Sequence, residues 1–144
     1  MINNLIFCNE KALSKKQCKD IIHSIREPYR RQDRLECTNY RLPIELYESM
    51  NSKYPTINWK GAVQIYNKDD YFEPHRDTVG YPNYRILSMT VCLNDEYKGG
   101  KFFIDSEKIT LEIGDAVVFK PREIHWVTPV TKGTRYSLAM WGYE

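Results

Sequence analysis

The chain has 144 residues, of which 42% are hydrophobic and 28% are charged, and its formal net charge is +2 at pH 7. This length and balance fit one folded domain with a buried core and exclude a disordered chain. No run of 18 apolar residues is present, which excludes a membrane-spanning helix, and so small a net charge gives no argument for a nucleic-acid partner.

The N-terminal part of the chain begins with a strand pattern and continues with a helix pattern. Residues 5–8, LIFC, predict a short strand. Ser14 is expected to be a helix N-cap, because apolar residues recur at helical spacing through residues 15–27. Pro28 is expected to end this helix. The polar segment 29–41 predicts a loop with a short strand.

After a second helix, the pattern changes to short strands separated by turn residues. Residues 43–51 predict that helix, with Pro43 in its first turn. The expected strands cover residues 57–66, 84–94, 101–105, 108–113, 115–120, 125–130 and 134–143. Many short strands of this kind are typical of an antiparallel barrel or sandwich, and a jelly roll is the natural candidate.

The expected class is therefore mainly β with N-terminal helices (α+β), built on a double-stranded β-helix, or jelly roll. We expect residues 1–144 to form a single domain, in which 1–55 are a helical N-terminal support and 56–144 are the jelly-roll core. The N-terminus lacks the pattern of a signal peptide, and the four cysteines form no CxxC pair. The expectation is a cytoplasmic protein with reduced thiols.

The segment YFEPHRD, residues 71–77, places His75 and Asp77 two positions apart. Alternate residues of a strand share a face, so this imidazole and carboxylate are expected to project side by side. His125 begins a later strand that a jelly roll can bring next to them, whereas His23 lies on the solvent side of the first helix. Two histidines and one carboxylate are the ligands of non-haem Fe(II) oxygenases. From these residues alone, a surface His75–Asp77 pair and a core His125 remain the alternative.

Arg135 and Ser137 also share a strand face. Arginine holds carboxylates with two parallel hydrogen bonds, and a neighbouring hydroxyl adds a donor. This pair therefore predicts a clamp for one end of a dicarboxylate whose other end chelates the metal. An ion pair between Arg135 and an acidic residue of a neighbouring strand is the alternative.

The segment ILSMTVCL, residues 86–93, has two unlike faces. One face carries large apolar side chains: Leu87, Met89, Val91 and Leu93. The other face carries small, weakly polar ones: Ser88, Thr90 and Cys92. Small polar residues on a strand that lines a barrel predict a ligand cavity, and a solvent-facing strand is the alternative.

These segments together resemble the 2-oxoglutarate- and Fe(II)-dependent dioxygenases, most closely the prolyl-4-hydroxylase type. The resemblance runs from about Trp59 to Tyr143. Its pieces, in order, are VQIYNKDDYFEPHRD, YRILSMTVCLND, KGGKFFI, IGDAVVFKP, HWV and GTRYSLAMW. Each piece alone is unspecific, but the set in this order is specific. The first 55 residues resemble only the helical support common in this family.

The resemblance implies a role for each matching position. The implied iron ligands are His75, Asp77 and His125. The implied 2-oxoglutarate pocket contains Tyr66, Arg135, Ser137, Thr90 and Cys92. The implied substrate-binding residues are Arg76 and Trp141. Animal oxygen-sensing relatives often have a cosubstrate-binding tyrosine at the position of Cys92, so its absence here gives Tyr66 more weight and argues against oxygen sensing.

The resemblance further implies hydroxylation of a C–H bond, with a peptidyl proline as the leading substrate. The implied cofactors are Fe(II), 2-oxoglutarate and O2, with succinate and CO2 as coproducts and ascorbate as a further candidate. The expected partner is a peptide or protein, and neither nucleic acid nor membrane is expected.

Two alternatives remain open. A nucleic-acid demethylase of the AlkB type shares the sequence RYSL, but it usually has a second arginine where this chain has Trp141, and a larger N-terminal lid. Arg30, Arg31 and Arg34 could contact phosphates, although a solvated charged loop is the preferred interpretation. A cupin-like metal-binding module without turnover needs no carboxylate clamp, so Arg135 argues against it.

Overall fold

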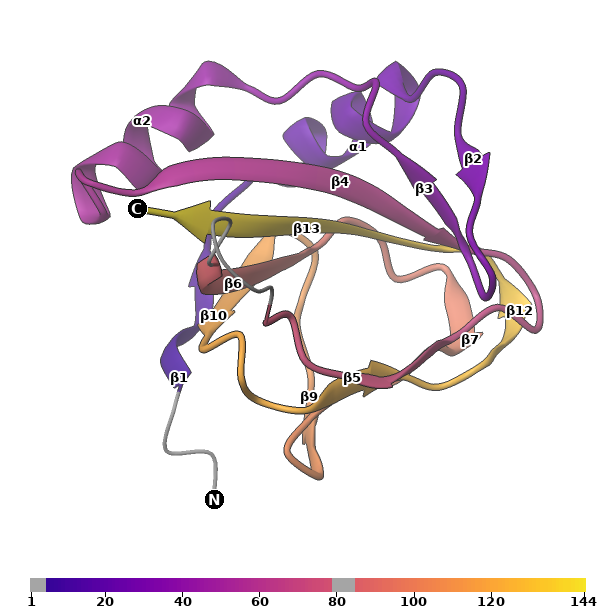
Figure 1. Ribbon diagram of the computed structural model, residues 1–144. Helices are drawn as coiled ribbons and strands as arrows, with labels where there is room; N and C mark the ends of the chain where they lie inside the picture. The colour runs from indigo at the N-terminus through magenta and orange to yellow at the C-terminus, as the bar shows by residue number, and fades with distance from the viewer. Residues whose placement is uncertain (1–4, 79–84) are drawn as a thin grey trace.

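The computed structural model describes residues 5–78 and 85–144 (Figure 1). Its two helices are α1 (Lys15–Ser24) and α2 (Ile44–Lys53). The strands before residue 71 are β1 (Leu5–Lys11), β2 (Tyr29–Arg30), β3 (Leu35–Cys37) and β4 (Asn58–Tyr66). The later strands are β5 (Phe72–His75), β6 (Arg85–Cys92), β7 (Tyr97–Gly99), β8 (Phe102–Ile104), β9 (Glu107–Ile109), β10 (Asp115–Phe119), β11 (His125–Val127), β12 (Val130–Gly133) and β13 (Arg135–Tyr143).

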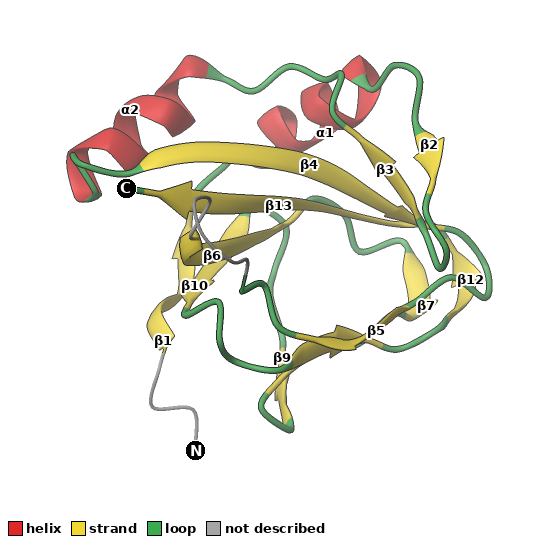
Figure 2. Ribbon diagram, viewed as in Figure 1, coloured by secondary structure: helices red, strands yellow, loops and turns green. Residues whose placement is uncertain are grey.

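The fold is built on one large sheet covered by the two helices. Seven strands lie in the order β1-β10-β6-β13-β4-β3-β2, with the long strand β13 paired to both β4 and β6. Both helices lie against the outer face of this sheet (Figures 1 and 2). A second sheet, in the order β5-β11-β8-β9, lies opposite the first. The mainly β fold with N-terminal helices confirms the expected class.

The helix-covered face of the large sheet holds the main apolar core. Its buried side chains come from α1, α2 and the sheet, and include Cys18, Ile21, Leu46, Met50, Val63 and Leu138. The four large residues of β6 and its end, Leu87, Met89, Val91 and Leu93, belong to the same core. The small residues of β6 therefore face the other way, toward the second sheet, as expected for a strand that lines a cavity.

Helix α1 begins where the sequence predicts and ends earlier. The Ser14 side chain accepts a hydrogen bond from the Gln17 N–H, and the Gln17 side chain accepts one from the Ser14 N–H, which forms a capping box. The helix stops at Ser24 rather than at Pro28, because Ile25 is already extended. The Ser24 hydroxyl donates to the Ile21 carbonyl and accepts from the Arg41 N–H, so it ties the helix end to the following loop.

The N-terminal third contributes more than helical support. Strand β1 pairs with β10, and β3 pairs with β4, so both extend the large sheet. The expected strand over residues 125–130 is divided into β11 and β12, and residues 131–133, expected to be a turn, belong to β12 and pair with β7. Residue 84, the expected start of β6, lies outside the described residues.

The structure describes both helices and three of the four cysteines. Neither helix is long and apolar enough to cross a lipid bilayer. Cys18, Cys37 and Cys92 are buried free thiols.

Candidate active site

Three side chains that the sequence singled out meet between β5 and β11. These strands are antiparallel neighbours, and His125 lies directly opposite His75. The Nε2 atoms of His75 and His125 lie 3.4 and 3.2 Å from Oδ1 of Asp77. One possible ligand atom from each residue lies within 4.8 Å of the others. The structure thus brings the expected triad together.

Asp77 reaches this position from outside the strand. Strand β5 ends at His75, and the Asp77 N–H donates to the carbonyl of Pro121 at 2.8 Å. The two residues therefore face the same point because a loop contact orients Asp77, and not because both belong to one strand.

Backbone carbonyls fix the orientation of both imidazole rings. Nδ1 of His75 lies 2.7 Å from the Glu73 carbonyl oxygen, and Nδ1 of His125 lies 2.9 Å from the Glu123 carbonyl oxygen. A carbonyl only accepts hydrogen bonds, so Nδ1 must carry the proton in each ring. Nε2 of each ring is therefore the nitrogen that faces Asp77, and it is the nitrogen that would bind a metal.

Asp77 offers one of its two oxygens to the triad. Oδ2 accepts hydrogen bonds from the Ser88 hydroxyl at 2.6 Å and from the Trp141 indole N–H at 3.2 Å, and Oδ1 remains on the histidine side. Burial alone would raise the pKa of Asp77, but hydrogen bonds from His125, His75 and Ser88 outweigh it and hold the pKa well below its usual range. The carboxylate is therefore ionised and suited to bind a metal through Oδ1.

A stack of side chains supports His75 from behind. The Phe72 ring lies 3.8 Å from the His75 ring, centroid to centroid, and the two planes differ by 11°. The guanidinium carbon of Arg34 lies 3.4 Å from the centre of the same phenyl ring. Phe72 begins β5, and Arg34 comes from the segment between β2 and β3. Contact with the Phe72 ring restricts the rotation of the imidazole, and Arg34 in turn contacts the Phe72 ring.

This contact corrects the interpretation of residues 29–34, which contain Arg30, Arg31 and Arg34, as a solvated charged loop. Arg34 is buried and forms ion pairs with Asp33 at 2.6 Å and with Glu36. Arg30 is paired with Asp70 at 2.7 Å. Both arginines are therefore committed to intramolecular contacts.

The expected carboxylate clamp is buried and lacks an acidic partner. Arg135 is 6% exposed, its Nη1 donates to the Ser137 hydroxyl at 3.2 Å, and its Nε has no hydrogen-bond partner. No Asp or Glu in the described part of the chain forms an ion pair with it. A buried guanidinium without a counter-ion is costly, so the arrangement suits an anionic ligand.

Tyr66 lies beside this arginine. Its ring centre is 5.0 Å from the guanidinium carbon of Arg135, and its hydroxyl donates to Gln64 Oε1 at 3.2 Å. Burial raises the pKa of Tyr66 to about 12, although the nearby Arg135 opposes this. The phenol therefore stays protonated at neutral pH, and its O–H would have to turn from Gln64 to donate to a ligand carboxylate.

One cavity joins the triad to the clamp. It has an empty volume of about 390 Å³, including open solvent at its mouth. The predicted site residues that line it are His75, Asp77, His125, Tyr66, Thr90, Arg135, Ser137 and Trp141. Cys92 lines a neighbouring hollow that also contains Thr90 and Arg135.

The two expected substrate-binding residues differ in position. Trp141 lines the cavity, where its indole also holds Asp77 and its ring packs 4.4 Å from the guanidinium carbon of Arg85. Arg76 is exposed, and its Nε donates to the carbonyl of Arg122 at 2.9 Å. The structure does not bring Arg76 into the cavity, so its contact with a substrate stays a prediction.

Three residues that support the site were not identified from the sequence: Ser88, Phe72 and Arg34. Ser88 had a visible signal, because it begins the small polar face of β6, of which only Thr90 and Cys92 were assigned. Phe72 and Arg34 had none, because their contact joins two segments that are distant in the sequence.

The donor set fits Fe(II) and a dicarboxylate. Two imidazole nitrogens and one carboxylate oxygen would leave positions open on a bound metal, and all three residues line the cavity. The unpaired Arg135 guanidinium in the same cavity suits the second carboxylate of a chelating ligand.

Ser88→Ala is expected to weaken metal binding without unfolding the protein. The change frees Oδ2 of Asp77 from its shortest hydrogen bond, so the carboxylate is no longer held in one orientation. Loss of such a supporting contact typically costs roughly 10- to 100-fold in metal affinity. Anaerobic Fe(II) titration of Ser88→Ala and of the exposed control Ser52→Ala checks this, and equal affinities would contradict it.

Comparisons with known proteins agree with this geometry. The family model described as "2OG-Fe(II) oxygenase superfamily" matches residues 61–143. A "PKHD-type hydroxylase" of Delftia acidovorans is 39% identical over 64 residues, which are 40% of this chain and 28% of that protein. The chain thus matches little more than a quarter of that relative's length.

Solved structures share the fold. A Pseudomonas putida prolyl-4-hydroxylase has a TM-score of 0.70 at 16% identity, covering 96% of this chain and 91% of that one. A viral collagen prolyl hydroxylase from Paramecium Bursaria Chlorella virus-1, in a 2OG complex, has a TM-score of 0.65 at 18% identity, covering 95% and 94%. At these identities the likeness concerns the fold.

Proposed function

The chain belongs to the 2OG-Fe(II) oxygenase superfamily, and from this premise we propose that it is an Fe(II)- and 2-oxoglutarate-dependent dioxygenase. It hydroxylates a C–H bond and forms succinate and CO2 as coproducts. The leading substrate is a peptidyl proline. We also propose that residues 1–144 act as one oxygenase domain.

The observation that carries this proposal is the shared cavity. A metal-binding triad alone is also found in proteins that bind a metal without catalysis. A buried arginine alone is also found on strands where it has only a structural role. Here His75, Asp77, His125 and Arg135 line the same cavity, and Arg135 begins β13, whereas Trp141, which contacts Asp77, lies near the other end of that strand. A 2-oxo dicarboxylate needs both the triad and the arginine, because it chelates a metal at its keto acid and carries a second carboxylate.

Each side chain has a defined task in this proposal. His75, Asp77 and His125 hold the metal, which supplies the redox chemistry that activates O2. Ser88 and Trp141 fix the carboxylate of Asp77 so that Oδ1 faces the metal.

Arg135 and its neighbours orient the cosubstrate. Arg135 forms charge-assisted hydrogen bonds with its distal carboxylate, and the protonated Tyr66 and Ser137 hydroxyls provide further hydrogen bonds. Burial of these groups limits competition from water, which strengthens each contact.

The proline substrate is supported by the nature of the relatives. The curated relative is named a hydroxylase, and both solved structures are prolyl hydroxylases, one of them acting on collagen by its name. Trp141 lines the cavity and gives it an aromatic wall against which an apolar ring can pack.

The two rival functions lose support from particular contacts. A nucleic-acid demethylase would use cations near the site for phosphates, but Arg34 is buried and Arg30 is bound to Asp70. A metal module without turnover gives no reason for a buried Arg135 without an acidic partner.

Incubation with Fe(II), 2-oxoglutarate and air tests the proposal. We expect succinate to form, and a proline-containing peptide from a screened set to gain the mass of one oxygen atom. Parallel reactions with and without ascorbate show whether it is a further cofactor. Succinate without any modified peptide would retain the oxygenase and reject the proline substrate.

A further inference from the structure

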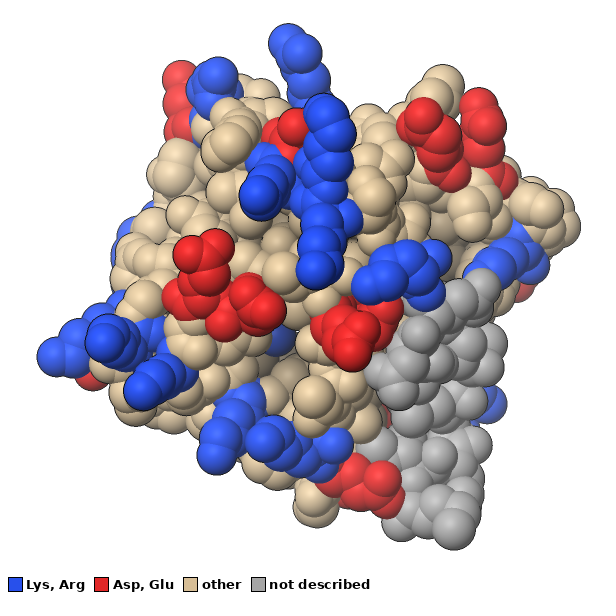
Figure 3. Space-filling model, turned by 180° about the vertical axis from the view of Figure 1, so that it is seen from behind, with Lys and Arg blue, Asp and Glu red and all other residues tan. Residues whose placement is uncertain are grey.

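A second hollow opens on the far side of Arg135. It has an empty volume of about 560 Å³, including open solvent, and it shares Thr90, Phe102 and Arg135 with the cavity of the metal triad. Its outer wall comes from the β7–β8 connection and from β9 with the residues that follow it. We call it the rear hollow. Figure 3 shows the molecule from behind, and there both Lys or Arg side chains and Asp or Glu side chains border a depression.

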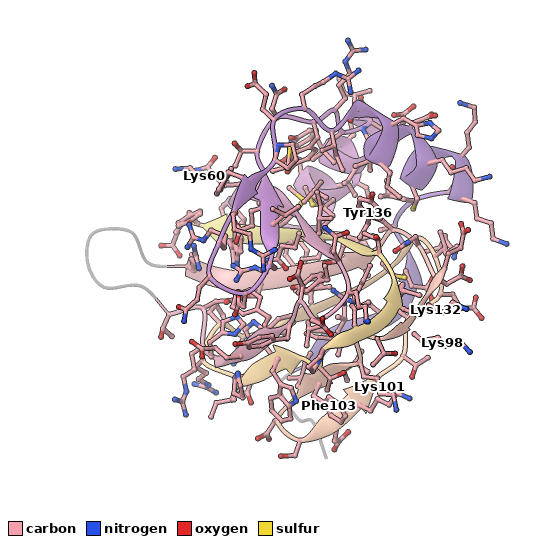
Figure 4. All side chains as sticks on the ribbon, turned by 90° about the vertical axis from the view of Figure 1, so that its right-hand side faces the viewer. Lys60, Lys98, Lys101, Phe103, Lys132 and Tyr136 are labelled. Atoms are coloured by element: carbon pink, nitrogen blue, oxygen red, sulfur yellow. The ribbon has the colours of Figure 1, made fainter. Side chains whose placement is uncertain are left out.

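The charged residues that line the rear hollow are all basic. Lys101, Lys108 and Arg135 line it, and none of its described lining residues is an Asp or Glu. Lys101 and Lys108 are exposed, whereas Arg135 is buried behind them. Lys101 projects outward in Figure 4, as do Lys98 and Lys132, which are paired between β7 and β12. A concave site lined by one sign of charge raises the local concentration of small anions and speeds their association.

Small residues allow this hollow to reach Arg135. Gly100 has φ +55°, which favours glycine, and a Cβ there would lie 3.0 Å from Cδ of Arg135. Any larger residue would push against the stem of the arginine. Cys92 and Thr90 form another wall with short side chains. Arg135 thus borders the rear hollow with its stem, while its guanidinium reaches Ser137 and Tyr66 in the cavity.

We propose that the rear hollow is the entrance through which C4–C5 dicarboxylates reach and leave Arg135. This inference rests on the proposed function, since it concerns the route of the cosubstrate and of the succinate formed from it. The substrate that is hydroxylated would then enter by the other opening, that of the cavity lined by the metal triad. Dicarboxylate exchange does not require that substrate to leave first.

The first test measures the rate at which 2-oxoglutarate binds to the Fe(II) protein without oxygen. Stopped-flow absorption follows the visible band that a 2-oxo acid gives when it chelates Fe(II). In the double variant Lys101→Glu, Lys108→Glu we expect the association rate constant to fall roughly three- to tenfold at low ionic strength. The difference should shrink at high salt, because screening removes long-range attraction.

Lys60→Glu is the matched control at the other mouth. Lys60 is exposed on β4 and is paired with Trp141 of β13, which lines the cavity and contacts Asp77, so we take it as the charge to reverse on the side of the metal triad. We expect its association rate to match the wild type. A slower rate in Lys60→Glu together with an unchanged rate in the rear double variant would place the entrance at the metal end and overturn the inference.

The second test narrows the entrance without changing its charge. Thr110 is exposed and lines the rear hollow, so Thr110→Trp obstructs it, whereas Thr56→Trp adds the same side chain at an exposed position outside the lining. A narrowed entrance slows association and dissociation by the same factor, so the dissociation constant should stay within twofold of the wild type. A changed dissociation constant with an unchanged association rate would contradict the entrance.

The two proposals fail in different ways. If the wild type binds 2-oxoglutarate with a visible band but the rear variants show wild-type rates, only the entrance is rejected. If the wild type gives no band, the proposed function is rejected, and the entrance with it.

Discussion

Asp77→Ala is expected to abolish stoichiometric Fe(II) binding, and with it all turnover, while the protein remains folded. Asp77 is the single anionic member of the triad and faces both imidazoles through Oδ1. Its removal leaves two neutral nitrogens, which bind Fe(II) weakly without a charged ligand. The fold should survive, because the main apolar core lies on the helix-covered face of the large sheet, away from the triad.

Metal content after anaerobic dialysis, together with far-UV circular dichroism, measures this effect. Glu73→Ala is the matched control, because it removes an exposed carboxylate from β5 and keeps the carbonyl that orients His75. We expect the control to bind iron as the wild type does. Equal iron content in Asp77→Ala and the wild type would reject the triad.

Arg135→Ala is expected to weaken 2-oxoglutarate binding far more than iron binding. The lost charge-assisted hydrogen bonds are worth roughly 1.5–3 kcal/mol, and a buried carboxylate left unpaired adds to the loss. Each 1.4 kcal/mol is about a factor of ten, so the affinity should fall by about one to two orders of magnitude or more. Iron should still bind, because Arg135 begins β13, whereas Trp141, which contacts Asp77 of the triad, lies near the other end of that strand.

Three further variants show what kind of contact is lost. Arg135→Lys should fall between the wild type and Arg135→Ala, because lysine keeps the charge but not the planar fork. Tyr66→Phe removes one neutral donor and should cost about 1 kcal/mol. Arg41→Ala, which removes an exposed arginine, is the control. Titration of 2-oxoglutarate into each Fe(II)-loaded variant without oxygen gives these affinities, and wild-type binding by Arg135→Ala would make Arg135 a purely structural residue.

The sequence predicted the parts of the site that depend on local patterns. Alternation along β13 places Arg135 and Ser137 on one face, and alternation along β6 separates its large residues from its small ones. The chain has only three histidines, so few residues could complete a metal site with His75 and Asp77. The prediction that His125 does so needed only one assumption, that the strands of His75 and His125 are neighbours, and β5 and β11 are paired.

The remaining features depend on tertiary contacts that leave no local signal. Asp77 is oriented by the carbonyl of Pro121, which lies in the loop before β11. The interaction of Arg34 with Phe72 brings the segment between β2 and β3 against β5. The early end of α1 similarly depends on the contact of Ser24 with Arg41. In each case a side chain or backbone group from a distant segment decides the local structure.

Anaerobic addition of 2-oxoglutarate to the Fe(II)-loaded wild-type protein tests the central claim most directly. The proposed geometry predicts a visible charge-transfer band, because a keto acid held at both ends of the cavity accepts electron density from the metal. The band should be lost in Asp77→Ala, and admission of air to the wild type should produce succinate. If the wild type shows no band and forms no succinate in air, the protein binds a metal without using 2-oxoglutarate, and the oxygenase function is contradicted.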